Sequence, residues 1–225
     1  MSAEPCIELR GVRFARPGGA FLLRADELCV ARGERVACFG PSGTGKTTLV
    51  ELLAGILVPD AGTIAVGGTP VSSLPDDARR AWRRERVGLV FQGLELLEYL
   101  CALDNVLLPY HLGAGPAGAE ARARAQGLLE RAGVGHAAAR LPARLSQGER
   151  QRVAVCRALA TEPELLLCDE VTANLDPATA AATLDLLLAE AKSTGATVLF
   201  VTHDRALLGR FDRAFDVRAL AGGLA

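Results

Sequence analysis

A stretch of eight residues has the composition and spacing needed to hold a chain of phosphates. It follows a short apolar segment, 35–39, and consists of Gly40, Pro41, Ser42, Gly43, Thr44, Gly45, Lys46 and Thr47. Glycines let main-chain N–H groups turn inward around phosphate oxygens, and the N-terminus of the following helix adds positive potential. Lys46 would supply a mobile positive charge to the β- and γ-phosphates, and the Thr47 hydroxyl can bind magnesium. The alternative is a glycine-rich turn with no ligand, and the complete motif between a strand and a helix disfavours it.

Two acidic residues follow another apolar segment, 165–168. Asp169 is expected to emerge at a sheet edge beside the phosphates and to hold magnesium, while Glu170 polarises the attacking water as general base. Taken alone, two acids at a strand end more often cap the next helix. The phosphate-binding loop in the same chain favours the catalytic interpretation.

The segment 146–149 has a structural and a functional interpretation, and both can hold. Its S-x-x-E spacing predicts a capping box, in which Ser146 caps a helix and Glu149 returns to the main-chain N–H of the cap. A helix capped in this way directs its dipole and free N–H groups outward, as binding of a γ-phosphate requires. Gly148 permits close approach of the backbone.

The rest of the chain predicts alternating strands and helices. A helix is expected over 47–57, ended by the turn at 59–62, and the pattern from 76 to 159 is mainly helical. Continuous apolar runs are typical of parallel strands covered on both faces, so we expect an α/β core with a mainly parallel sheet. The expected strands are 7–14, 21–30, 35–39, 63–66, 87–91, 165–168 and 197–201.

Length and composition exclude several classes of protein. A chain of 225 residues suits one domain with a substantial core, and no run approaches the ~20 apolar residues of a membrane-spanning helix. No signal peptide is expected, and the six scattered cysteines form no C-x-x-C pair, which favours a cytosolic location. The net charge of -1 argues against a nucleic-acid partner. The arginine-rich segment 79–86 also contains an acid and predicts a solvated helix face.

Together, the loop at 40–47 and the LSQGERQRVAVCRAL segment at 145–159 resemble the nucleotide-binding subunits of ABC (ATP-binding cassette) transporters. The resemblance covers nearly the whole chain and implies one domain, 1–225, that hydrolyses ATP with Mg²⁺. Its α/β fold would be a P-loop NTPase core of mainly parallel sheet with an N-terminal antiparallel β-subdomain, at 1–93 and 158–225. A helical subdomain at 94–157 would carry the signature motif.

The resemblance also implies roles for polar residues at strand ends. Gln92 matches the glutamine that senses magnesium or the attacking water, and His203 matches the histidine that bonds the γ-phosphate. As isolated residues, both would be ordinary strand-end side chains. The catalytic residues implied are Glu170, His203 and Gln92, and the metal ligands are Thr47, Asp169 and Gln92. The ATP-binding residues implied are Gly40, Pro41, Ser42, Gly43, Thr44, Gly45, Lys46, Thr47, Thr48 and Arg16, with Ser146 and Gly148 serving the ATP of the opposite subunit.

Two places need a separate interpretation. The family usually has an aromatic residue near the N-terminus that stacks on adenine, and this chain has Arg16 there. A guanidinium plane can also stack on a base, and Phe14 is the alternative platform. The segment 173–176 matches the one that crosses the dimer interface, although Asp176 before Pro177 is equally a helix cap.

The segment RVGLVFQGLELLEYLCALDNVLLP at 86–109 resembles the subgroup that works with lipoprotein-releasing and macrolide-exporting permeases. Here Glu98 and Cys101 replace the Pro and Thr of that subgroup. The resemblance implies a homodimer, or a pair with a related ATPase subunit, around ATP and a separate integral membrane permease. The subunit would lie in the cytoplasm, peripheral on the inner face of the membrane and not inserted in it. The alternative is a regulatory or mechanical ABC ATPase of the cell-division type, which moves no substrate.

Overall fold

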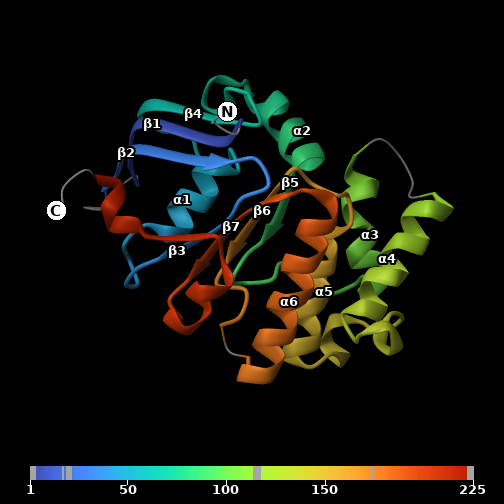
Figure 1. The fold of residues 1–225 in the computed structure, drawn as a ribbon. Helices are drawn as coiled ribbons and strands as arrows, with labels where there is room; N and C mark the ends of the chain where they lie inside the picture. Colours follow the sequence, from blue (N-terminus) through green and yellow to red (C-terminus); the bar gives the residue numbers. More distant parts are fainter. Residues whose placement is uncertain (1–3, 17, 19–21, 114–117, 174, 222–225) are drawn as a thin grey trace.

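The computed structural model describes residues 4–16, 18, 22–113, 118–173 and 175–221 (Figure 1). Its strands form two sheets, and the first is antiparallel in the order β2-β1-β4. In this sheet Ile7 of β1 pairs with Val30 of β2 on one side and with Val66 of β4 on the other. The predicted N-terminal antiparallel subdomain is therefore confirmed. Its strands are β1 (Pro5–Ala15), β2 (Leu22–Ala31) and β4 (Ala61–Val66).

The second sheet is parallel, in the order β5-β6-β7-β3-β8. The edge strand β8 was not predicted, because its four residues are only exposed or partly buried and form no apolar run. The other four strands agree with the apolar segments of the sequence. The five strands are β3 (Arg35–Phe39), β5 (Val87–Val90), β6 (Leu165–Asp169), β7 (Thr197–Thr202) and β8 (Arg213–Asp216).

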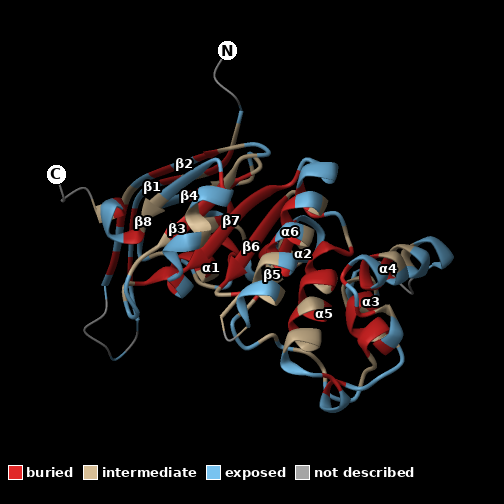
Figure 2. Cartoon of the chain, turned by 60° about the horizontal axis from the view of Figure 1, so that its bottom comes forward, coloured by how far each residue is buried: buried red, intermediate tan, exposed pale blue. Residues whose placement is uncertain are grey.

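Both faces of the parallel sheet are buried (Figure 2). Along β6, Leu165 and Leu167 belong to the core cluster shared with α1 (Lys46–Leu53) and the antiparallel sheet. Leu166 and Cys168 belong to the cluster shared with the helices on the other face. This alternation explains why the strand is an uninterrupted apolar run.

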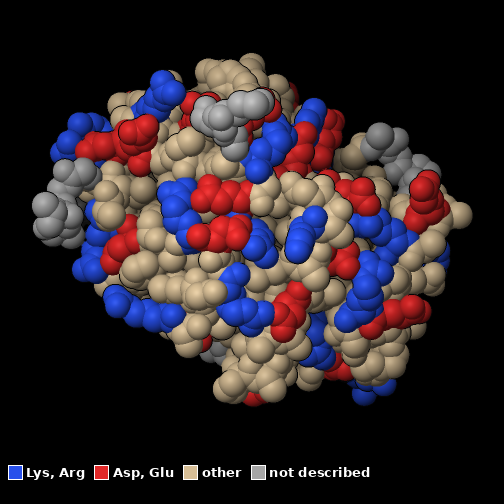
Figure 3. Space-filling model, viewed as in Figure 1, with Lys and Arg blue, Asp and Glu red and all other residues tan. Residues whose placement is uncertain are grey.

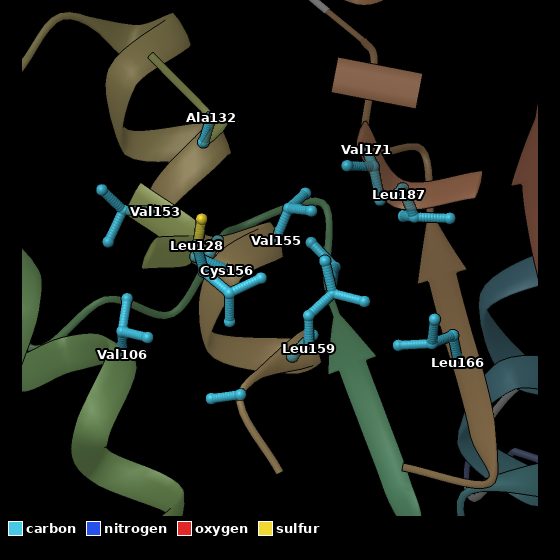
Figure 4. Close-up of a cluster of buried hydrophobic side chains, with 14 of the residues drawn as sticks. Val106, Leu128, Ala132, Val153, Val155, Cys156, Leu159, Leu166, Val171 and Leu187 are labelled. Carbon is cyan, nitrogen blue, oxygen red and sulfur yellow. The ribbon is translucent and has the colours of Figure 1, made fainter. Parts of the chain in front are cut away.

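The helices on the second face include one that lies within residues 145–159, which are called the signature segment below. They are α3 (Ala102–Leu112), α4 (Ala119–Arg131), α5 (Gln147–Leu159) and α6 (Pro177–Thr194). Figure 4 shows α5 between two groups of apolar side chains, with Val106 of α3 and Leu128 of α4 on one side. Leu166 of β6 and Leu187 of α6 lie on the other side. Since α5 packs against both the outer helices and the sheet, it connects the expected helical subdomain with the core. The boundary between the two at residue 157 stays a prediction.

Helix α1 ends four residues earlier than its apolar pattern predicted. The helix ends at Leu53, and Gly55 takes a left-handed backbone with φ 64°. The N–H groups of Gly55 and Ile56 donate to the carbonyls of Leu52 and Glu51, at 3.0 and 2.8 Å. This glycine-terminated hydrogen-bond pattern ends helices. The predicted stop at 59–62 was therefore wrong, and its last two residues belong to β4.

Helix α2 (Asp76–Arg86) carries the arginine cluster, and the predicted solvated face is wrong in part. Arg79 is buried and donates to the carbonyl of Leu74, and Arg83 donates to the carbonyls of Ala54 and Gly55. These two side chains therefore stabilise main-chain carbonyls of the same chain and do not form a solvated face. On the face shown in Figure 3, acidic and basic side chains are interspersed.

No helix within the described ranges is long and apolar enough to cross a membrane.

Candidate active site

Four neighbouring parallel strands bring the predicted site residues to one edge of the sheet. The phosphate-binding loop follows β3, and Gln92 follows β5. Asp169 ends β6 with Glu170 next to it, and His203 follows β7. Since the strands are parallel, their carboxyl ends meet at the same edge, where ligands of open α/β sheets bind.

The loop at 40–45 encloses one side of a cavity of about 340 Å³. Gly43 and Gly45 have φ of 77° and 97°, a left-handed backbone that residues with a Cβ rarely adopt. The Thr44 hydroxyl donates to the carbonyl of Pro41 at 2.7 Å, which closes the loop on itself. The cavity is lined by Arg16, Ser42, Gly43, Gly45, Lys46, Thr47, Thr48, Gln92 and Glu170.

Lys46 lies inside this loop with only 6% of its surface exposed. Its ammonium donates to the carbonyls of Gly40 and Pro41, both at 2.9 Å, and lies 3.8 Å from Oε1 of Glu170. A cation held by loop carbonyls can exchange those partners for phosphate oxygens, which bind an ammonium more strongly because they are charged.

The carboxylate of Glu170 lies close to three polar side chains of the site. Lys46 is near its Oε1, and its Oε2 lies 3.4 Å from Nε2 of Gln92 and 3.4 Å from Nδ1 of His203. Its own backbone has φ 52°, and its N–H donates to the carbonyl of Val201 at 3.0 Å. Strained backbone of this kind persists where the surrounding structure holds it, and it concentrates at functional sites.

Asp169 is 2% exposed, and its Oδ1 has no hydrogen-bond partner among the described residues. Burial raises the pKa of Asp169, opposed by a hydrogen bond with Thr47. An unpaired buried carboxylate oxygen beside a hydroxyl is a suitable ligand pair for a hard divalent cation. The residues present therefore fit magnesium.

Replacing Asp169 by Asn is expected to stabilise the nucleotide-free protein at pH 7. Because the folded-state pKa of Asp169 is raised above 3.8, ionisation of the carboxyl destabilises the fold as the pH rises through that pKa. Below pH 3.8 the group is protonated in both states, and the difference should vanish. Thermal unfolding in EDTA should show a higher Tm for the variant, by roughly 2–4 °C for each kcal/mol gained in the free energy of unfolding. A lower Tm at pH 7 would contradict this expectation.

The predicted capping box is present at the start of α5. The Ser146 N–H donates to Oε2 of Glu149 at 2.7 Å, and the Glu149 N–H donates to the Ser146 hydroxyl at 3.2 Å. Neither Ser146 nor Gly148 lines the cavity at the phosphate-binding loop. The structure of one chain therefore does not bring the signature residues to that chain's own phosphate-binding loop.

Arg16 lies at the cavity, and Phe14 does not. The Phe14 side chain is 6% exposed within the core cluster, so it is not available to stack on a base. The Arg16 guanidinium donates to Oε2 of Glu51 at 2.5 Å and to the Thr48 hydroxyl at 3.3 Å. Sequence reasoning missed Glu51, because an acid on a helix gives no local signal of a partner 35 residues away.

Glu170 also lines a second hollow, of about 610 Å³. His203, which is 61% exposed at its side chain, lines it together with Leu175 and Pro177. The carboxylate of Asp176 caps α6 by accepting from the Thr179 N–H at 3.0 Å, as predicted. Asn174 of the predicted interface segment lies outside the described residues. Glu170 thus lines both the phosphate cavity and this second hollow.

The fold and the loop define a P-loop nucleotide-hydrolysing domain, and the comparisons with known proteins specify which kind. The ABC transporter family matches residues 23–173. The lipoprotein-releasing system ATP-binding protein LolD of Cereibacter sphaeroides is 45% identical over 204 residues, which cover 91% of each chain. YbbA of Escherichia coli, described as an uncharacterized ABC transporter ATP-binding protein, is 41% identical, covering 95% of this chain and 94% of its own.

The solved structures agree with these relatives. The dimeric structure of MJ0796, a bacterial ABC transporter cassette, has a TM-score of 0.84 with 32% identity and covers 93% of both chains. A post-hydrolysis state of MJ0796 bound to ADP and Pi gives the same values. The chain therefore belongs to the ABC transporter family. It is an ATP-binding subunit of that family and an ATPase.

Proposed function

We propose that two copies of this subunit close around two ATP molecules and power a separate membrane permease. The observation that carries the proposal is the position of Glu170, which lines both the cavity of the phosphate-binding loop and the second hollow, beside His203. A second copy filling that hollow would bring a capped helix N-terminus toward the γ-phosphate. The dimeric cassette structure is consistent with such an arrangement.

Each ATP would be bound by one phosphate-binding loop and by the signature segment of the opposite copy. In this proposal the main-chain N–H groups of 40–48 and the Lys46 ammonium bind the phosphates, and Arg16 lies beside the base. Magnesium would be held by the Thr47 hydroxyl, Asp169 and Gln92, and would neutralise phosphate charge. Ser146 and Gly148 of the opposite copy would complete the γ-phosphate site.

Hydrolysis would depend on the group around Glu170. Its carboxylate accepts a proton from the attacking water as general base. Gln92 and His203, both within 3.4 Å of Oε2, would orient that water and the carboxylate. His203 would also donate a hydrogen bond to the γ-phosphate.

The permease would dock beside Gln92. A mainly apolar groove of about 240 Å³ lies there, with Leu89, Phe91, Leu108 and Leu112 among its lining residues. Leu112, which lines this groove, is 57% exposed, and contiguous exposed apolar surface of this kind marks contact sites. Through this contact the subunit would lie peripherally on the cytoplasmic face of the membrane. We propose residues 94–157 as the helical subdomain that moves with the permease.

The names of the relatives favour transport over the regulatory alternative. LolD is described as part of a lipoprotein-releasing system, and YbbA as part of an ABC transporter. We therefore propose that the permease is of the lipoprotein-releasing type, and we favour this over an ATPase of the cell-division type.

Mixing two inactive variants tests the shared site. Lys46→Met removes the phosphate cation of one chain, and Gly148→Asp places a negative charge where the γ-phosphate would lie. A Cβ at Gly148 would meet its nearest neighbour, Thr179, at 3.4 Å, which is ordinary van der Waals contact, so the fold accommodates a Cβ at this position. In a symmetric dimer the mixed pair keeps one intact site, so mixing should restore up to about a quarter of the wild-type rate.

Gly148→Ala is the control, since it adds the same Cβ without the charge and should retain more activity than Gly148→Asp. If the signature segment served its own chain, neither variant would contain a working site. A mixture as inactive as its components, under conditions in which both proteins are folded, would contradict the proposed dimer.

A further inference from the structure

The turn after Gln92 has an unusual backbone. Leu94 and Glu95 are consecutive residues with φ of 63° and 51°, in the left-handed region. Both carry a Cβ, which makes this conformation unfavourable unless surrounding contacts hold it. The N–H groups of Leu94 and Glu95 donate to the carbonyls of Phe91 and Gly93, at 3.0 and 2.7 Å. These bonds fold the turn, while the carbonyls of Leu94 and Glu95 point to another partner.

That partner is Arg157, near the end of α5. Its Nη2 donates to the carbonyl of Leu94 at 2.6 Å and its Nη1 donates to the carbonyl of Glu95 at 2.5 Å. A planar guanidinium can hold two acceptors in a fixed geometry, which an ammonium cannot do. Burial lowers the pKa of Arg157, and the charge of Glu95 opposes this effect. The largely desolvated guanidinium of Arg157 thus donates to two backbone carbonyls, which lie 62 and 63 residues away in sequence.

The same contacts connect two parts of the proposed site. Gln92 lies two residues before Leu94, and its amide is 3.4 Å from Glu170. Helix α5 begins after the cap at Ser146 and has 13 residues, a length of about 20 Å. Because α5 is packed on both sides, a displacement of its signature end is expected to move Arg157 with it (Figure 4).

We propose that Arg157 is a positioning residue for ATP hydrolysis. It holds the turn at Leu94 and Glu95 so that Gln92 lies beside Glu170, and it makes this placement depend on the position of α5. Arg157 does not line the cavity of the phosphate-binding loop, so it acts through Gln92 and does not touch the nucleotide. The inference rests on the proposed roles of Gln92 and Glu170.

Arg157→Lys tests this role, because Lys keeps the charge and most of the stem but cannot bridge both carbonyls. We expect kcat for ATP hydrolysis to fall about 10- to 100-fold through misplacement of Gln92, while KM and ATP affinity change less than about twofold. Arg157→Gln is a second variant and should show the same loss. Arg122→Lys, at an exposed position on α4, is the matched control and should leave kcat unchanged.

A double-mutant cycle with Gln92→Ala separates positioning from general stabilisation. If Arg157 acts through Gln92, then Arg157→Lys should lower kcat by less than about twofold once Gln92 is absent. Multiplicative losses in the double variant, or an unchanged kcat in Arg157→Lys alone, would overturn the inference and leave the role of Gln92 intact. An unchanged kcat in Gln92→Ala would overturn both.

Discussion

Replacing Glu170 by Gln is expected to lower the rate of ATP hydrolysis by about 10²- to 10⁴-fold, the usual contribution of a general base. Gln has the shape of Glu and can still meet Gln92 and His203, but it cannot accept the proton of the attacking water. Loss of the carboxylate charge also removes repulsion toward the γ-phosphate. ATP binding should therefore be retained or tightened, and the ATP-bound dimer should accumulate.

Two measurements check this expectation: the steady-state release of phosphate, and light scattering with Mg-ATP. Glu85→Gln, at an exposed position on α2, is the matched control and should hydrolyse ATP at the parent rate. An unchanged rate in Glu170→Gln would show that another group is the base. A variant that binds ATP without turnover and yet stays monomeric would contradict the dimer and leave the assignment of the base intact.

The parallel core could be predicted from sequence because its signal is local. Segments such as 165–168 and 197–201 are uninterrupted apolar runs, and burial on both faces of a sheet requires that pattern. Strand β8 gave no such signal, because it lies at the sheet edge and its residues are exposed or partly buried. The early end of α1 depends on the left-handed backbone of Gly55, which the apolar pattern continuing to residue 57 concealed.

In the site too, features fixed by contiguous residues could be predicted, and features that depend on distant segments could not. The loop around Lys46 and the capping box at Ser146 are contiguous motifs, and the sequence predicts their conformation. The pairing of Arg16 with Glu51 and the backbone strain at Glu170 depend on contacts between distant segments. Phe14 is buried because its side chain points to the core side of β1, and this leaves Arg16 at the cavity. The sequence does not predict that orientation, because apolar and polar residues do not alternate strictly along the strand.

Replacing Lys46 by Met is expected to weaken ATP binding by about 10- to 150-fold, since one hydrogen bond from a charged group contributes roughly 1.5–3 kcal/mol. The Met side chain keeps the apolar stem, which matters because Lys46 is 6% exposed within the loop. What is lost is the ammonium that donates to Gly40 and Pro41 and faces Glu170. The variant should therefore fold, while its cavity loses the cation that meets the phosphates.

The increase of Tm with ATP measures this loss directly, because a ligand at 100 times its Kd stabilises the folded state by about 2.7 kcal/mol. If the variant binds about 100-fold more weakly, the same ATP concentration stabilises it by only about 0.4 kcal/mol. Lys192→Met is a stringent control, since Lys46 and Lys192 are the two lysines of the chain and Lys192 is exposed on α6. Equal Tm shifts in the two variants would mean that the Lys46 ammonium stays with the loop carbonyls when ATP is bound. The phosphate charge would then be met by main-chain N–H groups and the cation at Thr47 and Asp169 alone.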